Sequence, residues 1–202
     1  MKHAFAQVEA TNKANVTTDL RELHTIYRTD HKVTEQGFAD SEGYWWFTII
    51  RDPIERIVST YQNRILQISE HKTGKWPRLR ATLLGVSLEP SLNEFCSRLP
   101  RYRSMSRRLS AHMLPVQNYV GDSLQRFDAF YRMDEMDRLE ADLKARTGVE
   151  ISLQRMNSSG NNKSFGDLSP DAIRGICRFT KQEYQLIEGF YKFPDADAFQ
   201  GS

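Results

Sequence analysis

The clearest pattern in the chain is a short apolar run followed at once by a helical stripe. Residues 45–50 (WWFTII) are nearly all apolar, which is typical of a strand buried on both faces in a parallel sheet. Asp52 and Pro53 then suit the N-cap and first position of a helix. Apolar residues recur at helical spacing from Ile54 to Ile68, so we expect this helix to run to about residue 69.

Weaker patterns continue the alternation of strands and helices. We expect a loop over residues 71–90, a capping box at 91–94 that opens a short helix, a strand over 127–132, a helix capped by Asp134 and ended by Gly148, and a last helical region that begins at Ser169 and Pro170. This order indicates an α/β fold with a central, largely parallel sheet flanked by helices.

Length and composition fit one soluble domain over residues 1–202. The chain is 39% apolar and 27% charged, and no apolar run approaches the ~20 residues of a transmembrane segment. The first residues carry no export signal, so we expect a cytoplasmic protein. Two cysteines, Cys96 and Cys177, are too few for a disulfide framework or a zinc site, and we expect both to be reduced and buried, with no metal bound.

Charge is nearly balanced, with 28 basic and 26 acidic side chains, so no nucleic-acid partner is expected from the total. Basic residues nevertheless gather in residues 71–80 and 98–108. These clusters either line a cleft for an anionic substrate or serve solubility and surface ion pairs.

Candidate chemistry begins where the strand of residues 45–50 ends. Arg51 lies at the carboxyl end of that strand and beside a helix N-terminus, and Ser59 follows on the polar side of the helix. A guanidinium, a hydroxyl and a helix start can together hold a phosphate. Alternatively, Arg51 pairs with Asp52 or Glu55 and Ser59 is an ordinary surface serine. The residues alone leave both interpretations open.

Residues 47–61 (FTIIRDPIERIVSTY) closely resemble the 3′-phosphate-binding segment of the carbohydrate sulfotransferase family, which reads strand-RDPxxRxxSxY. Arg51 and Ser59 match the arginine and serine that hold the 3′-phosphate of 3′-phosphoadenosine 5′-phosphosulfate (PAPS). Weaker similarities follow in the family's order at residues 91–95, 112–117, 127–135 and 157–159, so the resemblance covers about residues 31–199. It implies a P-loop-like sulfotransferase fold.

The resemblance implies an activity as well. Such enzymes move a sulfuryl group from PAPS to a hydroxyl or amine of a carbohydrate or small-molecule acceptor, release adenosine 3′,5′-bisphosphate, and need no metal. Positioning, charge neutralisation and a general base near the acceptor are required.

The resemblance also suggests residues for these tasks. His31, twenty residues before Arg51, is our first candidate for the base, and His24 is the second. Candidates for contact with the acceptor are His112, which either lines the site or packs, and Arg107 and Arg108.

One family feature is missing from the sequence. No PKxGxS/T loop, which cradles the 5′-phosphosulfate, occurs, and residues 1–5 look like the helix that would follow it. We therefore expect a sulfotransferase-like domain that is incomplete at its N-terminus, located in the Golgi lumen if an anchor is missing. The alternatives are an inactive nucleotide-binding remnant or a nucleic-acid-binding module that uses the basic clusters. A P-loop kinase is disfavoured because no GxxxxGK[ST] occurs.

Overall fold

The structure, a computed structural model, describes residues 44–153 and 165–194. These residues form two compact units, which are described separately. Residues 44–50 and 119–153 belong to the sheet unit, and residues 51–118 and 165–194 belong to the helical unit. The single domain expected over residues 1–202 stays a prediction.

The sheet unit contains two parallel strands. Strand β1 (Phe47–Ile50) pairs with β2 (Ala129–Arg132), with Phe47 opposite Ala129 and Ile50 opposite Arg132. The Asp128 carboxylate accepts a hydrogen bond from the Trp46 amide at 2.7 Å, just before the paired residues. Both strands and their parallel arrangement were predicted, and the structure confirms them.

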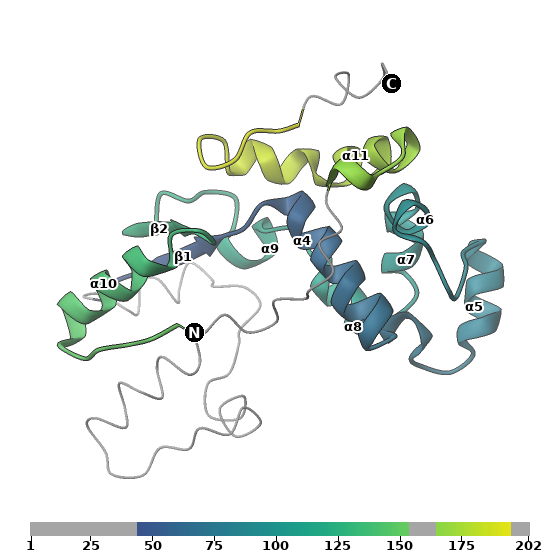
Figure 1. The fold of residues 1–202 in the computed structure, drawn as a ribbon, viewed down its shortest axis with the longest axis horizontal. Coiled ribbons are helices and arrows are strands. Elements are labelled where there is room, and N and C mark those ends of the chain that lie inside the picture. Colours follow the sequence, from purple (N-terminus) through teal and green to yellow (C-terminus); the bar gives the residue numbers. More distant parts are fainter. Residues whose placement is uncertain (1–43, 154–164, 195–202) are drawn as a thin grey trace, which may run out of the picture. The chain divides into compact units, whose positions relative to one another are not determined.

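Helix α10 (Met136–Thr147) packs beside β2 (Figure 1). It ends at Gly148, whose positive φ of 70° is the left-handed conformation that glycine adopts readily. The cap expected at Asp134 is wrong. Glu135 occupies the N-cap position, and the Asp134 carboxylate instead pairs with the Arg132 guanidinium at 2.7 Å.

The core of the sheet unit lies between α10 and the strands. Tyr131 of β2 is buried with Leu139 and Leu143 of α10, and Trp45 and Phe47 pack against this cluster. The Tyr131 hydroxyl donates a hydrogen bond to Asp142, and burial together with this carboxylate raises the pKa of Tyr131 to about 12. Trp45 and Phe47 therefore hold β1 against the core formed by β2 and α10.

The helical unit begins with the predicted long helix, whose first part is an α-helix and whose second part is a π-helix. Helix α4 (Pro53–Thr60) continues into the π-helix η1 (Tyr61–Gln67), where the Ile68 amide bonds to the Asn63 carbonyl five residues back. The wider turn changes which residues share a face. The apolar stripe is therefore buried as far as Ile65, whereas Ile68, expected to be its last member, is 52% exposed.

The remaining described elements are short apart from the last helix. They are η2 (Glu70–Lys72), α5 (Pro77–Leu84), α6 (Leu92–Ser97), α7 (Leu99–Arg103), α8 (Arg107–His112), α9 (Gln117–Val120), η3 (Phe165–Asp167) and α11 (Pro170–Leu186). The loop expected over residues 71–90 is wrong in part. Pro77 and Gly85, which suggested a loop, are the first residue and the left-handed C-cap of α5.

Helix α11 closes the core of the helical unit against α6 and α4. Gly175 makes this possible, because a Cβ atom there would lie 2.3 Å from the Cys96 carbonyl oxygen. Ser169 caps α11, as expected. Cys96 and Cys177 are free and buried, as predicted, and burial raises the pKa of Cys96 to about 12, so its thiol stays protonated.

Candidate anion-binding site at the start of α4

The turn before α4 is fixed by Asp52. Its Oδ1 accepts hydrogen bonds from the Ile54 and Glu55 amides, both at 2.9 Å, and its Oδ2 accepts one from the Tyr184 hydroxyl at 2.7 Å. Pro53 has no amide hydrogen to offer. The first amides of α4 are thus used by the chain itself, which corrects the expectation that free N–H groups of this helix start help to hold an anion.

Arg51 is half-buried and forms no hydrogen bond or ion pair with any residue that the structure describes. The alternative in which Arg51 pairs with Asp52 or Glu55 is therefore wrong, because the Asp52 oxygens bind amides and Tyr184 instead. A guanidinium always carries its charge in a protein. Arg51 thus presents a positive charge and five donors without a counter-ion in this part of the chain.

Ser59 lies on the same helix, six residues beyond Pro53, or about 9 Å along the axis at ~1.5 Å per residue. Its side chain is half-buried, and its Oγ accepts a hydrogen bond from the side-chain Nδ2 of Asn63 at 3.2 Å. The hydroxyl hydrogen finds no acceptor among residues 44–153 and 165–194. Arg51 and Ser59 do not contact each other, and both keep donors to offer.

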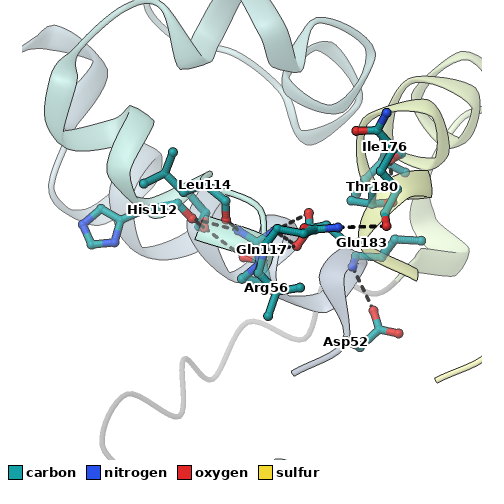
Figure 2. A network of polar contacts seen from close by, with 12 residues as sticks. Asp52, Arg56, His112, Leu114, Gln117, Ile176, Thr180 and Glu183 are labelled. Atoms are coloured by element: carbon teal, nitrogen blue, oxygen red, sulfur yellow. Dashed lines mark hydrogen bonds and ion pairs between the residues drawn. The ribbon is translucent and has the colours of Figure 1, made fainter. Parts of the chain in front are cut away.

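Arg56 belongs to the same motif, but both of its Nη groups are bound by the fold (Figure 2). Its Nη2 donates to both carboxylate oxygens of Glu183, at 2.7 and 2.8 Å, and its Nη1 donates to the Leu114 carbonyl at 2.9 Å and the His112 carbonyl at 3.3 Å. Glu183 also accepts from the Val116 amide at 2.9 Å. Both Nη groups of Arg56 are therefore engaged by the fold, and they link α4 to Glu183 and to the segment around His112 and Leu114.

Glu183 itself is a residue that sequence reasoning missed. It is 2% exposed, so burial raises its pKa, while Arg56 and the Val116 amide act in the opposite direction. No local pattern could reveal it, because its partner Arg56 lies 127 residues earlier in the chain. A glutamate in an amphipathic helix is ordinarily assigned to the solvent face.

His112 lies beside the second turn of α4. Its carbonyl accepts from Arg56 and, at 3.5 Å, from the Thr60 hydroxyl, while its Nε2 is 3.7 Å from Glu70 Oε2. Burial, followed by the charge of Arg64, lowers the pKa of His112, so the imidazole is neutral at pH 7. The His112 side chain is 39% exposed, so whether it packs or lines the site stays a prediction. Its predicted contact with an acceptor stays a prediction.

The remaining candidate residues are two exposed arginines and two histidines that the structure does not describe. Arg107 and Arg108 are exposed on the first turn of α8, and neither contacts Arg51 or Ser59. His24 and His31, the candidates for the base, lie outside the described residues.

No group of histidine, cysteine, aspartate or glutamate side chains in residues 44–153 and 165–194 is arranged to hold a metal ion. Within the same residues, no helix combines the length and the apolar character needed to cross a bilayer.

Comparison with known proteins adds the family. A search of curated proteins and of solved structures finds no match to this chain. A family model described as "Sulfotransferase family" matches residues 2–191, which is nearly the whole chain and includes Arg51, Ser59 and the partners of Arg56. With helices beside a parallel strand pair and a match of this extent, the chain belongs to the sulfotransferase family.

Proposed function

We propose that this protein is a PAPS-dependent sulfotransferase with a P-loop-like fold, in which Arg51 and Ser59 hold the 3′-phosphate of the nucleotide. The observation that carries the proposal is the state of Arg51. Its charge has no counter-ion in the described residues, although carboxylates lie one and four residues away in the chain. A dianionic phosphate supplies the missing partner in a geometry that suits a guanidinium fork.

The unused hydroxyl donor of Ser59 supports the same proposal. Its free donor lies about 9 Å along α4 from the helix start, and an extended arginine side chain bridges much of that distance. A phosphate group between the two accepts hydrogen bonds from both. Because Asp52 already occupies the amides of α4, side chains rather than the helix dipole carry the recognition.

The reaction follows from the donor. An acceptor hydroxyl attacks the sulfur, the bond between sulfur and the bridging phosphate oxygen breaks, and adenosine 3′,5′-bisphosphate leaves with the electron pair. The hydroxyl proton passes to a base, for which we propose His31 before His24. For an anionic carbohydrate acceptor we propose the exposed guanidinium groups of Arg107 and Arg108. Most of the catalysis is positioning and neutralisation of charge.

Ligand-induced thermal stabilisation tests the nucleotide site. Adenosine 3′,5′-bisphosphate at 100 times its Kd stabilises by about 2.7 kcal/mol, or roughly 5–10 °C for a chain of this size. Adenosine 5′-monophosphate, which lacks the 3′-phosphate, is expected to give a clearly smaller shift. Arg51→Ala removes the difference between the two nucleotides, whereas Arg178→Ala, an exposed arginine of α11, leaves it intact.

Two outcomes would reject the proposal. The first is no shift of the wild-type protein with either nucleotide, and the second is an equal shift with both. Turnover measured with labelled PAPS then separates an enzyme from a protein that binds the nucleotide without transferring its sulfuryl group.

A further inference from the structure

A second surface, formed by Trp76 and α5, exposes apolar side chains that the proposed function does not use. Trp76, Leu79 and Leu83 are 74%, 56% and 77% exposed, whereas Ala81 is the buried residue of this helix. Their spacing of three and four residues places them on one helical face, directed away from Ala81. Two of the three leucines of α5 therefore face outward, whereas an amphipathic surface helix ordinarily turns such side chains inward.

The conformation of Trp76 reinforces this exposure. Its φ of 66° and ψ of 47° lie in the left-handed region, which bulky residues rarely adopt. In this conformation Trp76 begins α5 while its ring remains in solvent, so no described packing compensates the strain. Residues in such sparsely populated conformations cluster at functional sites, ligand-binding ones among them.

Cations outnumber anions along this helix and the residues before it, although Glu89, the ion-pair partner of Lys72, borders the same segment. Residues 71–88 contain no aspartate or glutamate and four lysine or arginine residues. Lys75 and Arg78 are exposed and have no ion-pair partner among the described residues. Arg80, on the other flank of the apolar face, donates to the Met105 carbonyl at 2.9 Å but remains exposed. An apolar face bordered by cations complements a surface that offers hydrocarbon beneath a layer of negative charge.

We propose that this face, composed of Lys75, Trp76, Arg78, Leu79 and Leu83, docks on an anionic lipid bilayer. Leu79 and Leu83 enter the boundary between headgroups and acyl chains, the Trp76 indole lies at the headgroup level, and Lys75 and Arg78 contact lipid phosphates. Helix α5 then lies at the membrane surface without entering the bilayer core. This inference goes beyond the proposed sulfuryl transfer and does not depend on it.

Co-sedimentation of the full chain with vesicles tests the proposal. We expect binding to phosphatidylcholine vesicles that contain phosphatidylglycerol, and much weaker binding to phosphatidylcholine alone. Leu79→Ser with Leu83→Ser is expected to lower the partition coefficient at least about tenfold, because two apolar side chains leave the interface. Lys75→Glu with Arg78→Glu is expected to lower it at least about fivefold for each residue changed, because each substitution removes a positive charge and adds a negative one.

Matched controls lie away from α5. Met133→Ser changes another exposed apolar side chain, and Lys181→Glu with Lys192→Glu changes two other exposed lysines. Both controls should bind vesicles as the wild type does. Thermal unfolding of every variant shows that loss of binding is not loss of folding, since the α5 positions are solvent-exposed.

Fluorescence identifies which surface meets the lipid. Insertion shifts the emission of Trp76 to shorter wavelength, and Trp76→Phe should abolish this shift while Trp45 and Trp46 remain.

Three results would overturn the proposal: no binding of the wild-type protein to anionic vesicles, equal loss of binding in the control variants, or a wild-type dimer that Leu79→Ser with Leu83→Ser converts to a monomer without any lipid binding.

Discussion

Replacing Glu183 by glutamine is expected to lower the free energy of unfolding by about 2–4 kcal/mol. The carboxylate is 2% exposed and accepts two hydrogen bonds from Arg56 and one from the Val116 amide. Glutamine has nearly the same shape, but it brings an NH₂ group against donors and leaves the Arg56 charge without its partner. Removing one partner of a buried pair costs about 3–5 kcal/mol, and we lower this figure because the Arg56 side chain is 21% exposed and water can solvate it in part.

Chemical denaturation measures this loss as a lower midpoint with an unchanged dependence on denaturant. Glu188→Gln is the matched control, because Glu188 is exposed just beyond α11 and should change stability by less than about 0.5 kcal/mol. Arg56→Gln completes a double-mutant cycle, in which the combined variant should lose at least about 1 kcal/mol less than the sum of the single variants.

A loss for Glu183→Gln no larger than that for Glu188→Gln would refute this reasoning. Strict additivity of Arg56→Gln and Glu183→Gln would refute it too, since the ion pair would then carry no coupling of its own.

Two further predictions concern the same unit. Gly175→Ala should destabilise the protein by about 2–3 kcal/mol in thermal unfolding, because the new Cβ would meet the backbone at Cys96 and Ser97. Helix propensity alone favours alanine over glycine by about 1 kcal/mol, so a variant that is more stable than the wild type contradicts the close approach. For His71, 1% exposed, burial lowers the pKa below its ordinary 6.5 despite the Leu88 carbonyl, so the folded state binds the proton less well than the unfolded chain. Stability is therefore lost as pH falls through about 6.5 toward the folded-state pKa, and His71→Gln should flatten this loss in unfolding measured at several pH values; an unchanged slope contradicts it.

The strand, turn and helix around Arg51 could be predicted because their signals are local and strong. The apolar run of β1, the cap at Asp52 and the first helical position at Pro53 lie within a few residues of one another. The end of the stripe could not be predicted, because the π-helix of η1 moves Ile68 out of register, and apolar spacing was interpreted with the ordinary α-helical period. Helix α5 was missed because glycine and proline mark helix ends as well as loops.

In the candidate site, too, the residues of the local motif could be predicted and the long-range contacts could not. Arg51 and Ser59 were found from a motif, and the structure shows that both keep donors unused within the described residues. The expectation of free helix amides was wrong for a simple reason: Asp52, the residue that indicated a helix start, takes those amides itself. The role of Arg56 was missed because Glu183 is distant in sequence and carries no local signal.

Three successive residues near the end of α11 hold the segments around the candidate site. The Gln182 carbonyl accepts from the Gln117 side chain, Glu183 binds Arg56, and the Tyr184 hydroxyl donates to Asp52. The chain is therefore fixed by side-chain bonds at the residue after Arg51 and again four residues later. A cation whose backbone is already ordered loses less entropy on binding an anion, so for the proposed nucleotide site we expect α11 to contribute to affinity without touching the ligand. Weakening the bond between Glu183 and Arg56 should then reduce both the stability of the fold and the stabilisation by adenosine 3′,5′-bisphosphate, because the two depend on the same ordered turn.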